Sequence, residues 1–126
     1  MGARLPLYED GLNRREWIYV EDNCRAIHLL LQKGEDGQVY NISSGVELTN
    51  LWIVREALRF LDKGEDLREF VADRPGHDRR YLLSSEKLHD LGWRPLHNLQ
   101  DGLERTITWY LENRRWWERL GYEKNL

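Results

Sequence analysis

The segment Asp73-Arg74-Pro75-Gly76-His77-Asp78-Arg79-Arg80-Tyr81 carries more information than any other part of this 126-residue chain. Proline fixes one backbone angle and glycine permits a positive one, so Pro75-Gly76 predicts a sharp turn. Such a turn gathers guanidinium and imidazole donors at one point, which suits a phosphate or diphosphate group. The alternative is a solvated loop whose aspartates and arginines pair with one another.

The composition indicates a soluble, globular protein, because 33% of the residues are charged and 40% are hydrophobic. A net charge of −3 argues against nucleic acid as the main partner. No apolar run reaches the roughly 20 residues of a membrane span, and the start has no signal-peptide pattern. A cytoplasmic protein without membrane contact is therefore expected. Cys24 is the single cysteine, which excludes an internal disulfide and a multi-cysteine metal site.

Short strands scattered among helices predict a mixed α/β domain. Aromatic and β-branched residues predict strands at residues 15–20, 38–43, 67–72 and 81–83. No regular element is expected in residues 1–13, which Pro6 and Gly11 interrupt. Four helices are expected. The first starts after residue 21, and the other three are capped by Thr49 or Asn50, by Ser84 or Ser85, and by Asn98. Helical spacing predicts buried positions at Ala26, Ile27, Leu30, Leu31, Leu51, Val54, Leu58, Leu61, Leu88, Leu91, Leu99, Leu103, Ile107, Tyr110 and Leu111.

Several segments together resemble the dTDP-glucose 4,6-dehydratases of the extended short-chain dehydrogenase family. The segment 73–81 is similar to the signature loop of these enzymes. The similarity continues through Leu5–Gly11, Arg14–Asp22, Tyr40–Gly45, Leu91–Pro95, Trp109–Asn113 and Trp116-Trp117. The pieces around Tyr19–Asp22 and Leu91–Pro95 are shared by many sugar-nucleotide epimerases and dehydratases. The arginine-rich loop and the paired tryptophans favour the dehydratase.

The resemblance implies that the chain binds a dTDP-sugar. The Pro6-Leu7-Tyr8 stretch would meet the thymine base, and Arg15 and Arg74 would bind the diphosphate. Asn50 would add an amide donor beside a helix start, and His77 would bond to the ribose or phosphate end. The substrate-binding residues implied in this way are Pro6, Leu7, Tyr8, Arg15, Asn50, Asp73, Arg74, Pro75, Gly76 and His77.

Structural roles are the alternatives for some of these residues. Arg15 could be an exposed strand charge, and Asn50 a plain helix cap. Arg79 and Arg80 are expected to form structural ion pairs with nearby acidic residues.

No catalytic, cofactor-binding or metal-binding residue is expected in this chain. In the family, NAD is held at a glycine-rich turn between a strand and a helix, and a Tyr-x-x-x-Lys pair transfers the proton. Neither motif occurs in the sequence, and its histidines lack the H-x-x-x-H spacing of a zinc site. Residues 1–126 are therefore expected to be one nucleotide-sugar-binding domain. It would be the carboxy-terminal part of a dehydratase whose NAD-binding Rossmann domain is absent, and inactive alone.

The intact enzyme would use NAD to dehydrate dTDP-glucose to dTDP-4-dehydro-6-deoxyglucose, a step of deoxysugar biosynthesis. One alternative is a fragment of another nucleotide-sugar epimerase or decarboxylase. A different class is a stand-alone, non-catalytic module that binds a nucleotide sugar or a partner protein. Arg114–Arg119 could stack on RNA, but packing at a helix end is favoured.

Self-association is also expected. The resemblance implies that Val39–Ile42 joins the sheet of the absent domain, which would leave an unpaired and fairly apolar edge.

Overall fold

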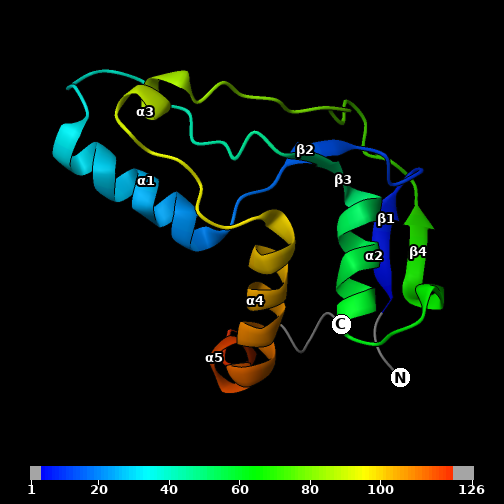
Figure 1. Cartoon of the computed structure of the whole chain (residues 1–126). Coiled ribbons are helices and arrows are strands. Elements are labelled where there is room, and N and C mark those ends of the chain that lie inside the picture. The colour runs from blue at the N-terminus through cyan, green and yellow to red at the C-terminus, as the bar shows by residue number, and fades with distance from the viewer. Residues whose placement is uncertain (1–3, 121–126) are drawn as a thin grey trace.

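The computed structural model describes residues 4–120 as a mixed α/β fold, which confirms the predicted class (Figure 1). The predicted domain of residues 1–126 extends beyond the described residues at both ends, and Met1 lies outside them. The strands are β1 (Leu5–Tyr8), β2 (Arg14–Glu16), β3 (Glu47–Thr49) and β4 (Arg68–Val71). The helices are α1 (Val20–Lys33), α2 (Asn50–Phe60), α3 (Glu86–Asp90), α4 (Leu99–Glu112) and α5 (Arg114–Glu118), with a 3-10 turn at Glu65–Leu67. None of the described helices is long and apolar enough to cross a bilayer.

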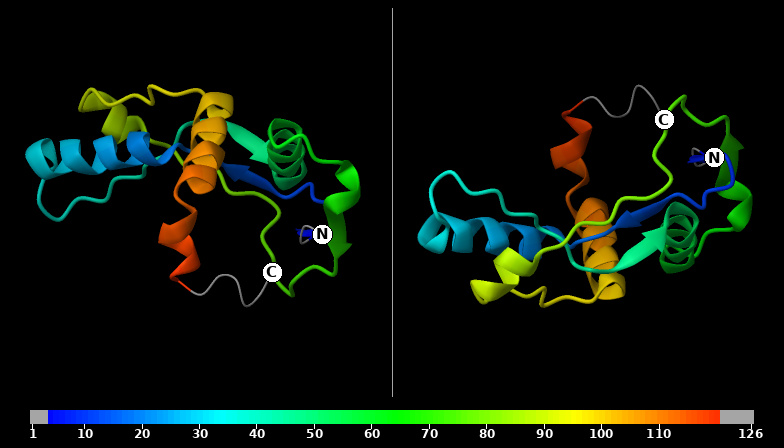
Figure 2. Two further views of the ribbon diagram at one scale, coloured as in Figure 1. Left: turned by 90° about the horizontal axis from the view of Figure 1, so that it is seen from below. Right: turned by 90° about the horizontal axis from the view of Figure 1, so that it is seen from above.

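The described strands form two small sheets. β1 runs parallel to β4, with Leu5 opposite Arg68 and Tyr8 opposite Val71. β2 is antiparallel to β3, and an isolated bridge connects Arg14 to Arg80. Figures 1 and 2 show β1, β4 and α2 at one end of the molecule and α1 with α3 at the other. α4 lies between these two ends and continues into α5.

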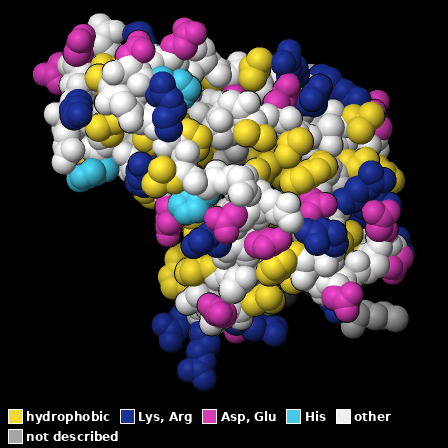
Figure 3. All heavy atoms as spheres, viewed as in Figure 1, with side chains coloured by type: hydrophobic (Ala, Val, Ile, Leu, Met, Phe, Trp, Pro, Cys, Tyr) yellow, Lys and Arg dark blue, Asp and Glu magenta, His cyan; other side chains and the backbone are white. Residues whose placement is uncertain are grey.

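The hydrophobic core is divided between the two ends. At one end, Ala26 of α1 packs with Leu88 of α3 and with Trp93, and all three are buried. At the other end, Leu7 of β1 and Leu58 of α2 are buried. Apolar side chains also reach the surface, including the part formed by α4 and α5 (Figure 3).

The strands predicted at residues 38–43 and 81–83 are wrong. Both segments lack a paired strand within residues 4–120, and an extended segment becomes a β-strand only when a neighbour accepts its hydrogen bonds. The strand predicted at 15–20 is limited to β2, because the chain turns into α1 after Tyr19. β4 confirms the strand predicted at 67–72.

Two described strands were not predicted. β1 includes Pro6, which is expected from the sequence to interrupt any regular element. In a two-stranded sheet each strand has a free edge, and proline is tolerated there because its missing N–H removes no ladder bond. β3 is only three residues long and has no strong pattern of its own.

Most helix boundaries follow the predicted caps, but α1 begins at Val20, before the predicted start after residue 21. α1 ends at Gly34, Asn98 caps α4, and Thr49 rather than Asn50 caps α2 by accepting the N–H of Trp52 at 3.1 Å. The predicted buried faces are partly wrong. The exposed fractions are 46% for Ile27, 82% for Leu31, 49% for Tyr110 and 62% for Leu111. Ile27 and Leu31 lie on an exposed face of α1, whereas Tyr110 lines a cavity that is described below.

Candidate functional site

The parallel pairing of β1 with β4 brings two distant parts of the sequence together. Both strands end at the same edge, where the N–H of Glu9 donates to the carbonyl of Val71 at 2.8 Å. The arginine-rich loop leaves β4 at this edge and so begins beside Tyr8. The predicted turn is confirmed, because Gly76 has φ +70° and the N–H of His77 donates to the carbonyl of Arg74 at 3.1 Å.

His77 lies at the centre of a polar cluster, and its side chain is only 5% exposed. Its Nδ1 is 2.5 Å from Oδ1 of Asp73, and its Nε2 is 3.0 Å from Nη2 of Arg15. The Tyr8 ring meets the imidazole edge-on, with centroids 5.3 Å apart. The hydrogen bond from His77, aided by the backbone N–H of Arg74, holds the pKa of Asp73 below its usual value even though desolvation opposes this shift.

Arg15 is fixed by neutral groups. Its Nη2 donates to the carbonyl of Asp78 and its Nη1 to the carbonyl of Arg14, both at 2.7 Å. The guanidinium carbon lies 4.3 Å from the centre of the Tyr81 ring, a cation–π contact. The Tyr81 hydroxyl donates to the Asp78 carboxylate at 2.7 Å, and this bond raises the pKa of Tyr81.

The arginines of this region fall into two groups. Arg79 pairs with Asp10 through two contacts of 2.8 Å, and Arg80 pairs with Glu47, which confirms the predicted structural ion pairs. The bond from Arg79 lowers the pKa of Asp10 to about 2. By contrast, within residues 4–120 neither Arg15 nor Arg74 forms a salt bridge. The guanidinium carbon of Arg74 lies 5.2 Å from the centre of the Tyr8 ring.

Asn13 belongs to the cluster but was not predicted. The residue is 1% exposed, and its Nδ2 is 3.4 Å from Nδ1 of His77. Its Oδ1 is buried without a hydrogen-bond partner in the described structure. The signal was available in the sequence: Asn13 precedes Arg15 by two positions, and residues two apart in an extended segment share a face.

The remaining predicted residues lie around this cluster. Asn50 is the first residue of α2, and its N–H donates to the carbonyl of Asn13 at 3.0 Å. The side chain of Leu7 is buried, so only its backbone can face a ligand. Pro75 and Gly76 form the exposed turn. The structure thus brings Tyr8, Arg15, Asp73, Arg74 and His77 together. Asn50 is connected to this cluster through the backbone carbonyl of Asn13.

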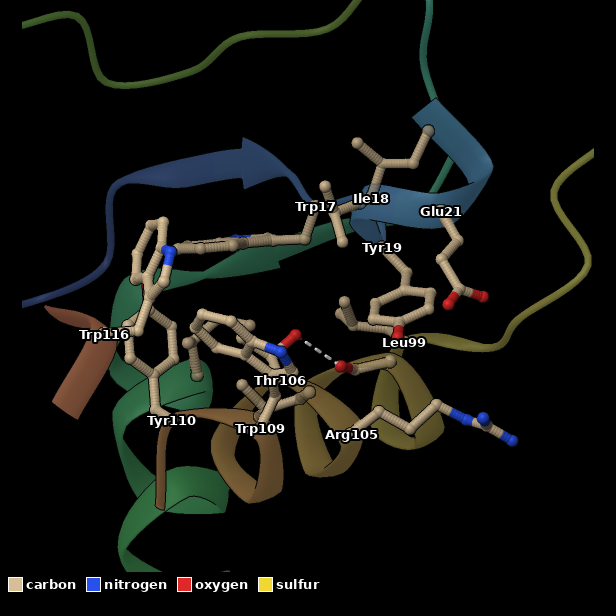
Figure 4. A pocket seen from close by; sticks show the side chains of 14 residues that line it. Trp17, Ile18, Tyr19, Glu21, Leu99, Arg105, Thr106, Trp109, Tyr110 and Trp116 are labelled. Atoms are coloured by element: carbon tan, nitrogen blue, oxygen red, sulfur yellow. Dashed lines mark hydrogen bonds between the residues drawn. The ribbon is translucent and has the colours of Figure 1, made fainter. Parts of the chain in front are cut away.

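A separate cavity of about 600 Å³ lies between the start of α1 and helices α2, α4 and α5. Figure 4 shows that its walls are largely aromatic, with contributions from Trp17, Tyr19, Trp109, Tyr110 and Trp116. The cavity shares no lining residue with the His77 cluster. Its apolar walls do not suit a diphosphate, whose charge requires polar partners.

Comparison with known proteins relates the chain to nucleotide-sugar enzymes. The family model described as GDP-mannose 4,6 dehydratase matches residues 2–106. A low-salt glycan biosynthesis protein of Haloferax volcanii is 51% identical over 110 residues, covering 87% of this chain and 36% of that protein. The dTDP-glucose 4,6-dehydratase of Streptomyces niveus is 47% identical over 120 residues, covering 94% of this chain and 36% of the enzyme.

Solved structures agree with this relationship. The crystal structure of dTDP-glucose 4,6-dehydratase from Bacillus anthracis in complex with NAD matches with a TM-score of 0.85 and 43% identity. The match covers 94% of this chain and 38% of that one. The chain therefore spans somewhat more than a third of the length of the relatives it matches.

Proposed function

Because the chain belongs to the GDP-mannose 4,6 dehydratase family, we propose that it forms the dTDP-sugar-binding part of a dTDP-glucose 4,6-dehydratase. Relatives of that name match 94% of the chain, and one of them was solved in complex with NAD. In the intact enzyme, NAD would supply the hydride transfer that accompanies dehydration of dTDP-glucose to dTDP-4-dehydro-6-deoxyglucose. The present residues would bind and orient the nucleotide part of the substrate, and the domain that holds NAD would lie outside them.

The observation that supports this proposal is the contrast between paired and unpaired arginines. Arg79 and Arg80 form salt bridges with Asp10 and Glu47, whereas Arg15 and Arg74 have no carboxylate partner within residues 4–120. An arginine without a carboxylate keeps its full charge for an anionic ligand, and guanidinium donors match the oxygens of a diphosphate. Among the arginines in and beside the arginine-rich loop, the two without a carboxylate partner are the two that the resemblance assigns to the diphosphate.

The neighbouring groups suit the rest of a nucleotide. The Tyr8 ring at the end of β1 is 37% exposed and offers an aromatic face near Arg74. Asn50 lies in the first turn of α2, where the helix dipole favours negative charge. Its backbone N–H already donates to the carbonyl of Asn13, so its side-chain amide would be the donor to the ligand. We assign the base to the side of Tyr8 and the diphosphate to Arg15 and Arg74.

Calorimetric titration of the purified chain with dTDP, UDP and GDP tests the proposal. We expect dTDP to bind most tightly and Arg74→Ala to weaken its binding about tenfold or more, since a hydrogen bond to a charged group contributes about 1.5–3 kcal/mol. Arg79→Ala is the matched control, because it removes an arginine that is already paired with Asp10. Equal, weak binding of all three nucleotides that Arg74→Ala leaves unchanged would contradict the proposal.

A further inference from the structure

We propose that Asp73 is a positioning residue that orients Arg15 through the imidazole of His77. The three side chains form one chain of contacts, 2.5 Å from Asp73 to His77 and 3.0 Å from His77 to Arg15. This inference rests on the proposed function, because it takes Arg15 as a ligand of the diphosphate.

The direction of the hydrogen bonds determines the state of the imidazole. Guanidinium nitrogens only donate, so Nε2 of His77 must accept from Arg15 and must carry no proton. A neutral imidazole then carries its proton on Nδ1 and donates it to Asp73. The amide nitrogen of Asn13 also lies near Nδ1, but at 3.4 Å its contact is far longer than that of the carboxylate. The carboxylate therefore selects the tautomer that Arg15 requires.

This arrangement separates the carboxylate of Asp73 from the guanidinium of Arg15. A carboxylate in direct contact would hold Arg15 equally well but would neutralise its charge, as happens for Arg79 beside Asp10. With the neutral ring between them, Arg15 is oriented by an acceptor that carries no charge. The carbonyl of Asp78 and the ring of Tyr81 hold the same guanidinium from other sides, also without a formal charge. Arg15 is thus immobilised and still cationic, which is what a rigid phosphate-binding group needs.

Removal of Asp73 has a defined consequence. Without the acceptor at Nδ1, the proton is free to move to Nε2, where it faces the N–H groups of Arg15. Two donors then oppose each other across a 3.0 Å contact, and the guanidinium loses its fixed orientation. Asp73→Asn keeps an oxygen acceptor at this position and serves as the conservative variant.

Nitrogen-15 NMR of the His77 ring, combined with dTDP titration, tests the inference at pH 7.5. We expect a protonated Nδ1 and an unprotonated Nε2 in the wild-type chain and in Arg74→Ala, the control that removes a phosphate ligand outside this chain of contacts. Asp73→Ala should lose this signature and bind dTDP about tenfold more weakly, and Asp73→Asn should restore part of both. A wild-type ring protonated on Nε2, or an Asp73→Ala variant that keeps both the Nδ1 proton and the affinity, would overturn the inference.

The guanidinium signals of Arg15 separate this inference from the proposed function. If the wild-type chain binds no dTDP, the proposed function fails, and these signals still report on positioning. Their loss through faster exchange with water in Asp73→Ala supports the coupling between the two residues. Unchanged signals in a folded Asp73→Ala variant overturn it.

Discussion

The backbone N–H of His97 donates to Oδ2 of Asp22 at 3.0 Å, and Nδ1 of its ring lies 3.1 Å from the same oxygen. The N–H of Leu96 donates to the other carboxylate oxygen at 2.9 Å. Asp22 is fully buried on α1, so these bonds tie the segment that leads into α4 to the first helix. Burial alone would raise the pKa of Asp22, but the bonds from Leu96 and His97 hold it below its usual value of 3.8.

Asp22→Asn should lower the free energy of unfolding at pH 7 by about 1–3 kcal/mol, because the buried donors lose a charged acceptor. A carboxylate with a depressed pKa stabilises the fold above its unfolded pKa, and this contribution is lost as the pH falls through the folded pKa. The difference between wild type and Asp22→Asn should therefore narrow below about pH 4. Urea unfolding followed by tryptophan fluorescence at several pH values measures it. Asp36→Asn, at an exposed loop position, is the control, and a difference that is constant down to pH 2 would contradict the prediction.

Gly102→Ala should destabilise the protein, although alanine in a helix interior is ordinarily favoured over glycine by about 1 kcal/mol. A Cβ at residue 102 would lie 2.8 Å from the Cβ of Tyr19, closer than two carbon atoms can approach without a shift of α4. Overpacking of this kind costs about 1–3 kcal/mol. Thermal unfolding of Gly102→Ala should show a lower Tm than wild type, whereas Gln100→Ala, at an exposed position of α4, should not. A Tm raised by Gly102→Ala would show that α4 and Tyr19 move apart without a loss of stability.

Self-association remains a prediction, and a second surface supports it. Residues 39–42 have no paired strand within residues 4–120, so association through this segment is untested. In addition, Val20, Ile27 and Leu31 lie on one face of α1 and are 61%, 46% and 82% exposed. An apolar helix face of this kind favours association with a second copy.

Light scattering at high micromolar concentration should detect this association, and Leu31→Glu should reduce it. Gln32→Glu adds the same charge at the next position and should have little effect. A monomer at all concentrations would show that the exposed face of α1 does not mediate association.

The purified chain should form no dTDP-4-dehydro-6-deoxyglucose from dTDP-glucose, with or without added NAD. Its sequence contains neither the glycine-rich dinucleotide motif nor the Tyr-x-x-x-Lys pair. Chromatography of the nucleotide products, with a full-length dTDP-glucose 4,6-dehydratase as the positive control, measures this directly. Detection of the dehydrated sugar would require catalytic residues other than those of the family.

The helices could be predicted from the sequence because their signals are local. Asn98 caps α4 with its own side chain, which accepts the N–H of Asp101 at 2.9 Å, and Gly34 ends α1 one residue after the last helical position. Strand formation at residues 38–43 could not be judged in this way, since it depends on a partner elsewhere in the chain. β1 was not predicted for the same reason: its partner, β4, is remote in sequence.

The candidate site shows the same division between local and remote information. The turn at Pro75-Gly76 and the structural role of Arg79 were predictable from neighbouring residues. That Arg79 would pair with Asp10 was not, because the two residues approach only after β1 and β4 have paired. The contact of Arg15 with His77 likewise joins positions 62 apart.

The long separation of the paired strands also determines when the site forms during folding. Leu5 lies opposite Arg68, so β1 meets β4 only after the chain between them has closed a large loop. Loop closure costs entropy before any long-range contact compensates for it, and contacts between distant residues therefore form slowly. We expect the cluster around His77 to be among the last parts of the protein to become native. A ligand that contacts both Tyr8 and the arginine-rich loop would then slow unfolding, because it would hold the ends of β1 and β4 together.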